Sequence, residues 1–392
     1  MSSAPDASPL KDELSRLVGF DTQNPPGREL EAAQFILDAL QRMGCRADAF
    51  DLGGGRANVV GLFENGPGPS FAFNTHIDVV PAGDGWTGDP FTLREEGGRL
   101  FGRGSCDAKG PMVAMLEAMR RLIAHRALWS GTLLGVFVAD EEVGSLGAKT
   151  YVKTAPKIDY CMIGEPTSCT TVTAHKGSLR PLVRVHGKTA HSGMPDLGVN
   201  AILKSARLLE MIVEEHPRTA ATSHPLCGNA SLTLTRAHGG HADNVVPEHC
   251  DFLLDRRMVP GEDEEAVKRS IADLVARAGR EAGTRAEIID YVPTTGGASE
   301  TDPAHPVVSA CQAACLAHNG VASDLSGFQG GCDLVHFRSV GAEGVVLGPG
   351  ELAVAHQPNE YVPVDDLVRA VTIYEDTALT LLGEGRLPEL ET

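Results

Sequence analysis

Histidines and carboxylic acids occur at five places in this 392-residue chain that suit a ligand site better than packing, namely the ends of apolar runs and turns flanked by glycine. In an open α/β sheet, ligands collect at the carboxyl ends of the strands, so we expect these places to converge in the fold. The residues concerned are His76 and Asp78 in NTHIDVVP, Asp107 in GRGSCDAKG, Glu141 and Glu142 in ADEEVGS, Glu165 in GEPTS, and His356 in GPGELAVAHQPNEYV.

Convergence of these residues would place four or five carboxylates in a small volume, where like charges strongly disfavour joint ionisation. A divalent cation removes that conflict. Three anionic and two neutral ligands suit two zinc ions, and cobalt or manganese can serve the same donors. A shared carboxylate would hold the ions at the roughly 3.5 to 4 Å that is typical of two-metal hydrolytic sites. The predicted ligands are His76, Asp107 as the shared residue, Glu142, Glu165 and His356.

Two further acids are predicted to assist the ligands. Asp78 projects to the same side of its strand as His76, so its carboxylate is predicted to accept the second ring N–H of that histidine and fix its tautomer. Glu141 cannot point the same way as Glu142 on an extended backbone, which leaves it free to take a proton from water. Each motif alone is also compatible with a structural role; DEE, for example, often starts a solvated helix. The prediction depends on all of the motifs occurring in order.

The elements that must position these residues alternate along the chain. In residues 1–176 and 293–392, apolar runs alternate with helical patterns, which predicts an α/β catalytic domain in two parts, with a mixed, largely parallel central sheet and helices on both faces. Residues 177–292 follow the order strand, helix, strand, strand, helix, strand, which predicts an inserted ferredoxin-like α+β domain. Predicted strands end at His76, Asp140 and Glu165, next to the candidate ligands.

The composition of the chain argues against some classes of partner and indicates its cellular location. The formal net charge of -18 argues against a nucleic-acid surface, which needs clustered Lys and Arg. No run approaches the roughly 18 apolar residues of a membrane span, and the first residues lack the pattern of a secretory signal. The nine cysteines show no paired spacing, which indicates reduced thiols in a cytoplasmic protein.

The motifs NTHIDVVP, GRGSCDAKGP, DEEVGS, GEPT and GPGELAVAHQPNEYV span nearly the whole chain in this order. They resemble the di-zinc metallopeptidases and deacylases that include acetylornithine deacetylase, succinyl-diaminopimelate desuccinylase, aminoacylase and glutamate carboxypeptidase. The resemblance implies a zinc-peptidase-like catalytic domain whose inserted lid domain commonly mediates dimerisation. By position, it implies that His76 and Glu165 bind one zinc, Glu142 and His356 bind the other, Asp107 bridges them, Glu141 is the general base and Asp78 orients the histidine.

The resemblance also extends to the inserted domain. HGKTAHSGMP is similar to the family's loop whose histidine reaches a neighbouring active site, which implies that His191 stabilises an oxyanion across a homodimer. Asn244 in HADNVVP and Arg257 in LDRRMVP match positions that in relatives bind the substrate's carboxylate or acyl group. Gly330 and Gly331 of GGCD are assigned to substrate binding with them.

The predicted activity is hydrolysis of the amide bond of an N-acyl amino acid or a related small amide. Glu165, where peptidase relatives often have Asp, favours deacylation. A dipeptidase or glutamate-carboxypeptidase-like exopeptidase shares every metal residue and stays an alternative, as does a non-catalytic metal-binding or scaffold protein on the same fold. The segment GPGELA formally fits a dinucleotide fingerprint, but Pro349 restricts the turn and Glu351 would repel a pyrophosphate.

Overall fold

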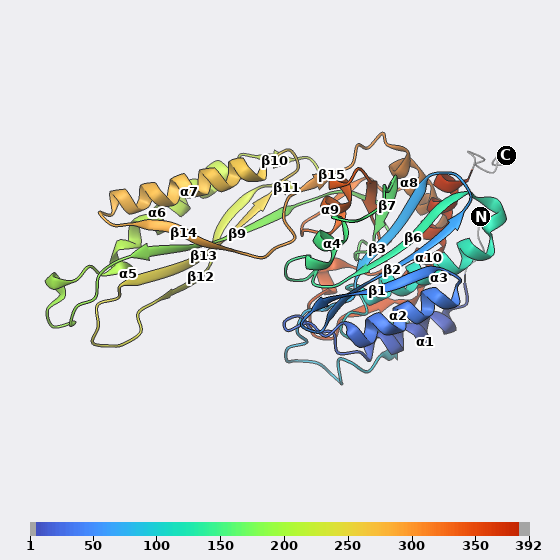
Figure 1. Ribbon diagram of the computed structural model, residues 1–392, viewed down its shortest axis with the longest axis horizontal. Coiled ribbons are helices and arrows are strands. Elements are labelled where there is room, and N and C mark those ends of the chain that lie inside the picture. Colours follow the sequence, from blue (N-terminus) through green and yellow to red (C-terminus); the bar gives the residue numbers. More distant parts are fainter. Residues whose placement is uncertain (1–4, 384–392) are drawn as a thin grey trace. The chain divides into compact units, whose positions relative to one another are not determined.

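The computed structural model describes residues 5–383 and divides the chain into two compact units (Figure 1). Unit 1 combines the chain up to Ala174 with Glu300–Gly327 and the chain from Cys332 onward. Unit 2 combines His175–Ser299 with Phe328–Gly331. The segment 177–292 expected as an insertion therefore lies within unit 2, and so do Gly330 and Gly331, which the sequence places in the segment 293–392.

Unit 1 is built on a mixed nine-stranded sheet whose order is β1-β2-β6-β3-β7-β17-β8-β15, with β16 pairing with β8. At its centre, β3 runs parallel to β6 and β7, and β17 runs parallel to β7, whereas β1, β2 and β8 pair in antiparallel fashion. This confirms the predicted mixed, largely parallel sheet. The strands are β1 (Arg46–Gly53), β2 (Arg56–Asn65), β3 (Ser70–His76), β6 (Gly131–Val138), β7 (Tyr160–Ile163), β8 (Val172–His175), β15 (Ser299–Glu300), β16 (Ser326–Phe328) and β17 (Glu343–Val346).

Helices cover both faces of this sheet, which is why every residue of β3 is buried. Phe71 and Phe73 of β3 share one hydrophobic core with α1, α2, α3, α8 and α10. On the other face, α9 packs on β7 and β17, and its Phe337 ring lies 5.9 Å from the ring of Tyr151 in α4. The helices are α1 (Ala7–Val18), α2 (Leu30–Arg42), α3 (Lys109–Ala124), α4 (Leu146–Tyr151), α8 (Pro306–Asn319), α9 (Leu334–Ser339) and α10 (Val364–Leu382).

Shorter elements complete unit 1. A three-stranded sheet has the order β18-β5-β4, and it brings Tyr361 opposite Phe101, close to the segments that carry His356 and Asp107. Its strands are β4 (Arg94–Glu96), β5 (Arg99–Phe101) and β18 (Tyr361–Pro363), and the short 3-10 helices are η1 (Arg126–Leu128) and η3 (Leu352–Val354).

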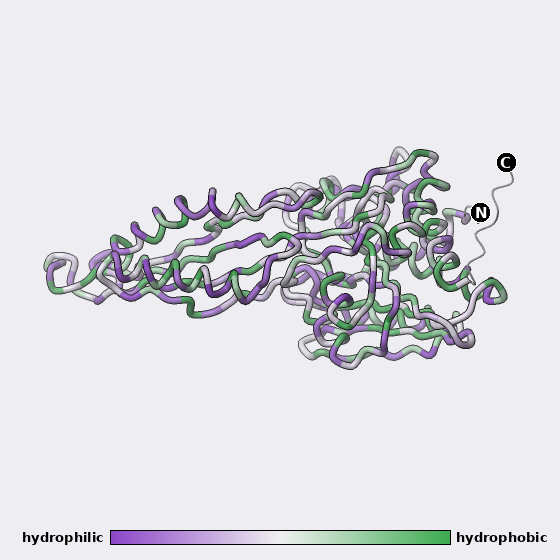
Figure 2. Tube along the Cα trace, turned by 90° about the horizontal axis from the view of Figure 1, so that it is seen from above, coloured by the Kyte–Doolittle hydropathy of each residue, from purple (hydrophilic) through white to green (hydrophobic). Residues whose placement is uncertain are grey.

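Unit 2 has the ferredoxin-like order, with a four-stranded antiparallel sheet of order β12-β13-β9-β14. Alternate residues of β9 are buried, and Val183 and Val185 share a core with the apolar sides of α6 and α7. Figure 2 shows hydrophobic and hydrophilic residues interspersed along the trace. The elements are β9 (Gly177–His186), η2 (Pro195–Leu197), α5 (Ala201–Lys204), α6 (Ala206–Ala220), β10 (Ser223–His224), β11 (Gly228–Asn229), β12 (Ser231–Gly239), β13 (His249–Met258), α7 (Glu264–Glu281) and β14 (Ala286–Val292).

The parallel strands of unit 1 bring the candidate residues to one edge of the sheet. His76 is the last residue of β3, Glu141 and Glu142 follow β6, and Glu165 follows β7. Since these strands are parallel neighbours, their carboxyl ends lie together. Within residues 5–383, no helix is long and apolar enough to cross a membrane.

Candidate metal centre

Asp107 occupies the middle of the site, in the turn that leads into α3. Its Oδ1 lies 3.1 Å from Nε2 of His76, and its Oδ2 lies 3.3 Å from Nε2 of His356. The carboxylate is buried, with 5% of the residue exposed. A carboxylate that turns one oxygen toward each of two imidazoles has the arrangement of a ligand shared by two metal ions.

The other two predicted ligands complete two groups around Asp107. Oε1 of Glu165 lies 3.9 Å from Nε2 of His76, and we call His76 and Glu165 the first half-site. Oε2 of Glu142 lies 3.1 Å from Nε2 of His356, and we call Glu142 and His356 the second half-site. The structure thus brings all five residues together, each half-site with one imidazole and one carboxylate of its own.

The donor set fits divalent metal ions. The ligand atoms of His76, Asp107 and Glu142 lie within 4.8 Å of one another, as do those of His76, Glu141 and Glu165. One oxygen of Glu141 and one of Glu142 are buried without a hydrogen-bond partner. A buried carboxylate oxygen can only accept, so a cation is the natural partner for both. Nitrogen and oxygen donors of this kind suit zinc, cobalt or manganese.

The carboxylates of the site disfavour one another's ionisation. Burial, followed by the charge of Glu165, raises the pKa of Glu141 well above its usual value. Burial and the charge of Asp107 do the same to the pKa of Glu165, and they raise the pKa of Glu142. Asp107 behaves differently: burial raises its pKa, but hydrogen bonds with His356 and His76 outweigh burial and lower the pKa below its usual value.

The acids of the site raise the pKa values of the two histidines. Hydrogen bonds with Asp107 and Glu142 raise the pKa of His356 to about 11. Burial alone would lower the pKa of His76, but the hydrogen bond with Asp107 and the charge of Glu165 raise it well above its usual value. The neighbouring acids thus favour the protonated form of both imidazoles. Divalent cations would release these protons, because imidazole binds metal in its neutral form.

Glu141 and Glu142 leave the strand in a turn, not on the extended backbone that the sequence suggested. The turn follows Asp140, whose φ of 67° lies in the left-handed region. Glu142 reaches the second half-site, whereas Glu141 lies with the first half-site. The two carboxylates do separate, but the turn is the cause.

The role predicted for the Asp78 side chain needs correction. Nδ1 of His76 lies 2.8 Å from the backbone carbonyl oxygen of Asp78, and 3.7 Å from its carboxylate. The carbonyl therefore accepts the second ring N–H. The carboxylate instead accepts the backbone N–H groups of Glu141 at 3.1 Å and of Glu142 at 3.2 Å. Strand alternation predicts only the direction of side chains. It therefore could not predict that the backbone carbonyl of Asp78, and not its carboxylate, accepts the ring N–H of His76.

Asp333 is a buried acid that the sequence did not assign to the site. It is 1% exposed, and its charge contributes to the raised pKa values of Glu141 and Glu165. Burial raises the pKa of Asp333 itself to about 7, which the charge of His76 partly offsets. Its position after Gly330 and Gly331 was a usable signal, because the other site acids also follow apolar runs or glycine turns.

The remaining predicted residues belong to unit 2. His191 and Asn244 lie on neighbouring exposed segments, since the N–H of Ser192 donates to the carbonyl of Asn244 at 2.9 Å. Arg257, on β13, donates from Nε to Asp255 at 2.7 Å. An added Cβ at Gly330 would lie 3.0 Å from the ring of Phe328, and one at Gly331 would lie 2.9 Å from Thr295, so either addition would require its neighbour to shift.

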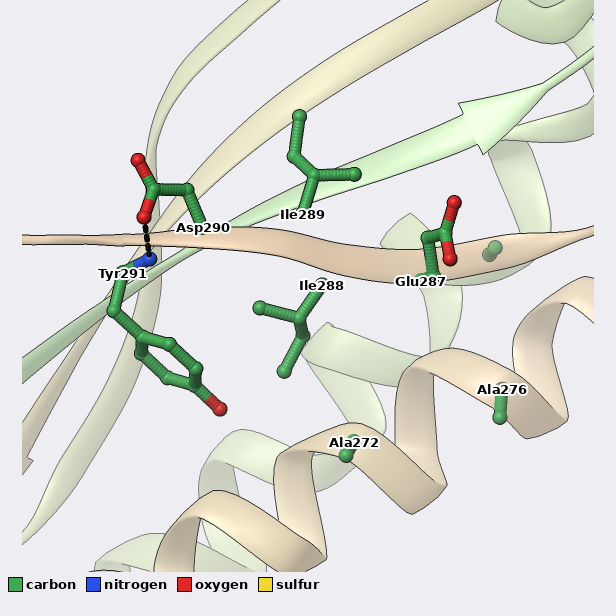
Figure 3. Close-up of a pocket in the computed structure, with 8 residues that line it drawn as sticks. Ala272, Ala276, Glu287, Ile288, Ile289, Asp290 and Tyr291 are labelled. Atoms are coloured by element: carbon green, nitrogen blue, oxygen red, sulfur yellow. Dashed lines mark hydrogen bonds between the residues drawn. The ribbon is translucent and has the colours of Figure 1, made fainter.

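Unit 2 also contains a hollow of about 590 Å³ between α7 and the edge strand β14 (Figure 3). Ala272 and Ala276 of α7 form one wall, and Ile288 and Tyr291 of β14 form the other. Two acids, Glu287 and Asp290, also line it, and Glu287 pairs with His186 and Arg285. Among the residues that the structure describes, no group of three possible metal ligands lies at this hollow.

Comparison with known proteins places the chain among related sequences. The model of the peptidase family M20/M25/M40 matches residues 72–380. An acetylornithine deacetylase of Myxococcus xanthus is 33% identical over 376 residues, covering 93% of this chain and 95% of the relative. A probable succinyl-diaminopimelate desuccinylase of Staphylococcus epidermidis is 30% identical over 396 residues, with the same coverage.

Solved structures share the fold. An M20 family metallo-carboxypeptidase of Sulfolobus solfataricus superimposes with a TM-score of 0.80, at 19% identity, and covers 95% of this chain and 99% of that one. A dinuclear metal-binding peptidase of the M20 family from Bacillus subtilis gives a TM-score of 0.73 at 16% identity, with 96% and 98% covered.

Proposed function

Since the chain belongs to the peptidase family M20/M25/M40 and is a metal-dependent hydrolase of amide bonds, we propose that its substrate is an N-acyl amino acid or a closely related small amide. The observation that carries the proposal is Asp107, which faces one imidazole with each oxygen while Glu141 lies buried beside it. The identity to deacylating relatives and the presence of Glu165 support deacylation over peptide cleavage.

We assign two zinc ions to the centre, with cobalt or manganese as possible substitutes. His76 and Glu165 would hold one ion, Glu142 and His356 the other, and Asp107 both. When bound, the ions polarise the amide carbonyl and acidify a water molecule. Glu141 then accepts the proton of the attacking water and returns it to the leaving amine. The carbonyl of Asp78 keeps His76 in the tautomer that presents Nε2 to the centre.

Unit 2 is proposed to complete the site in a homodimer, as its lid domain. His191 would donate to the oxyanion of the transition state, and Asn244, Arg257, Gly330 and Gly331 would bind the acyl group or the carboxylate of the substrate. A reducing, cytoplasmic location is part of the same proposal, because all nine cysteines are buried free thiols.

A substrate panel tests the proposal. Zinc- and cobalt-loaded protein is assayed with N-acetyl and N-succinyl amino acids and with dipeptides. We expect kcat/KM for at least one N-acyl amino acid to exceed that for any dipeptide by roughly tenfold or more, a difference of about 1.4 kcal/mol in transition-state binding. Preference for dipeptides would replace deacylation by exopeptidase activity. Cleavage of no amide by metal-loaded protein would favour the scaffold alternative.

A further inference from the structure

The turn that carries Glu141 and Glu142 is held from behind by a buried polar network that the catalytic proposal does not use. We propose that Asn24, Arg56 and Asp140 are positioning residues that fix this turn and thereby set the metal affinity of the second half-site. The inference rests on the proposed function for its metal ions, but its test needs no substrate.

Asp78 is the link between the network and the turn. Its Oδ1 accepts the N–H of Glu141 and its Oδ2 accepts the N–H of Glu142, so one carboxylate ties down both backbone amides. Asp78 is 0% exposed. Any movement of this carboxylate would be passed directly to the two residues that follow β6.

Asn24 holds two carboxylates with one amide. Its Nδ2 donates to Oδ2 of Asp78 at 2.9 Å and to Oδ1 of Asp140 at 2.9 Å. The residue is 1% exposed, and its backbone N–H also donates to the carbonyl of Val79, 2.8 Å away. Asn24 therefore connects the segment after β3 to the segment after β6, although it is distant from both in sequence.

Arg56, from β2, completes the network. Its Nη1 pairs with Oδ1 of Asp140, and its Nη2 donates to Oδ1 of Asn24 at 2.8 Å and to the carbonyl of Pro26 at 3.0 Å. The planar guanidinium can serve these acceptors together, because its donors point in fixed directions. It also supplies the positive charge that Asp140 requires in a buried location.

Asp140 closes the turn itself. Its carbonyl accepts the N–H groups of Gly144 at 3.0 Å and Ser145 at 2.5 Å, and its Oδ2 accepts that of Leu146 at 3.3 Å. The left-handed conformation of Asp140 costs on the order of 1 kcal/mol or more, so the surrounding contacts must hold it in place.

The network acts on the half-sites unequally. Glu142 is anchored through the turn, whereas His76 and Glu165 are carried directly by the ends of β3 and β7. Ligands must be held within about 0.5 Å of their productive positions. Loosening the turn should therefore weaken the second half-site, while the first half-site keeps its geometry.

Calorimetric titration of metal-free protein with Co²⁺ tests this inference. We expect two binding events in the wild type. In Asn24→Ala and Arg56→Gln, one event should weaken by roughly 10 to 100-fold, while the other changes by less than about threefold. Arg56→Lys, which keeps the charge but cannot serve Asp140 and Asn24 together, should fall between. Arg28→Gln is the matched control, because Arg28 makes an exposed pair with Asp21.

Three results would overturn the inference. These are unchanged affinity of both events in Asn24→Ala and Arg56→Gln, equal weakening of both events with a fall in melting temperature, and a wild type that binds no metal. Because Asn24→Ala removes only an amide, it serves if Arg56→Gln does not fold. A wild type that binds two ions but hydrolyses none of the panel would contradict the proposed function alone.

Discussion

Asp107 is the residue on which both half-sites depend, because each of its oxygens faces a different imidazole. The adjacent acids Glu141 and Glu142 have different surroundings. Glu142 pairs with His356, whereas Glu141 lies with His76 and Glu165. Adjacent glutamates can thus divide the work of binding metal and moving protons, and this division predicts different consequences for substituting each one.

Glu141→Gln should reduce kcat by at least about 10²-fold while the protein keeps its metal, because the amide cannot accept the proton of water. Glu142→Gln should lose metal, since it removes a charged ligand of the second half-site. The measurement is metal content alongside kcat for both variants. Wild-type turnover in Glu141→Gln would show that another group is the base.

Glu29 should make the stability of the fold depend on pH, and this effect does not involve metal. It is fully buried, and burial together with the charge of Asp78 raises its pKa to about 7 from 4.5. An acid whose pKa is raised on folding stabilises the fold less as the pH increases through that range. The loss between about pH 4.5 and pH 7 is on the order of 3 kcal/mol.

Glu29→Gln should therefore gain melting temperature over the wild type at pH 8 and gain little at pH 5. Thermal unfolding at both pH values gives the comparison, with the exposed Glu31→Gln as control. A variant that is less stable than the wild type at pH 8 would contradict the account of Glu29.

Residue types and spacing were enough to select the five metal-binding candidates, since acids and histidines after strands are conspicuous in the sequence. The contacts that support these residues were harder to predict from the sequence. The exchange between the carbonyl and the carboxylate of Asp78 depends on backbone direction, and Asn24 and Arg56 lie far from the turn in sequence. Contacts between distant segments leave no periodic pattern to detect.

At the scale of elements, parallel strands explain why the site forms at one edge of the sheet. Apolar runs predicted β3, β6 and β7, and the helical patterns predicted the helices that bury them. The edge strand β1 was not predicted, because it is an exposed antiparallel strand with few apolar residues. Its strand character depends on pairing with β2, which local sequence does not reveal.

Gly348 shows how closely the elements approach behind the site. An added Cβ there would lie 2.5 Å from the carbonyl oxygen of Glu165, a backbone atom that cannot rotate away. Gly348→Ala should lower the free energy of unfolding by about 1 to 3 kcal/mol and weaken metal binding at the first half-site. Denaturant unfolding checks the first effect, and calorimetry checks the second.

Gly88→Ala is the matched control, since nothing lies within 4 Å of an added Cβ at that position. Equal stability of the two alanine variants would show that the segment around Gly348 can move aside. The close packing of Gly348, which follows β17, against the Glu165 segment would then not be needed for the site.

At the scale of the whole molecule, one unit of the chain carries the candidate metal centre, and the other is a ferredoxin-like unit with exposed apolar side chains. On α5 and α6, Leu203 is 73% exposed and Val213 is 73% exposed. The proposed homodimer gives these side chains a partner. Sedimentation of the wild type should indicate a dimer at micromolar concentration, because a stable interface needs such an apolar centre.

Val213→Glu should shift this equilibrium toward the monomer by introducing a charge into the interface. Leu128→Glu, an equally drastic change at an exposed position of unit 1, should leave the dimer intact. A wild type that sediments as a monomer would contradict the proposed homodimer. A dimer that tolerates Val213→Glu would show that Val213 lies outside its interface.

The most direct test of the account is the metal content of the purified chain, measured by mass spectrometry of the elements after exposure to zinc, cobalt or manganese. We predict about two ions per wild-type chain and fewer than one for Asp107→Asn, because Asp107 serves both half-sites. Fewer than one ion per wild-type chain with all three metals, or two ions retained by Asp107→Asn, would contradict the shared metal centre.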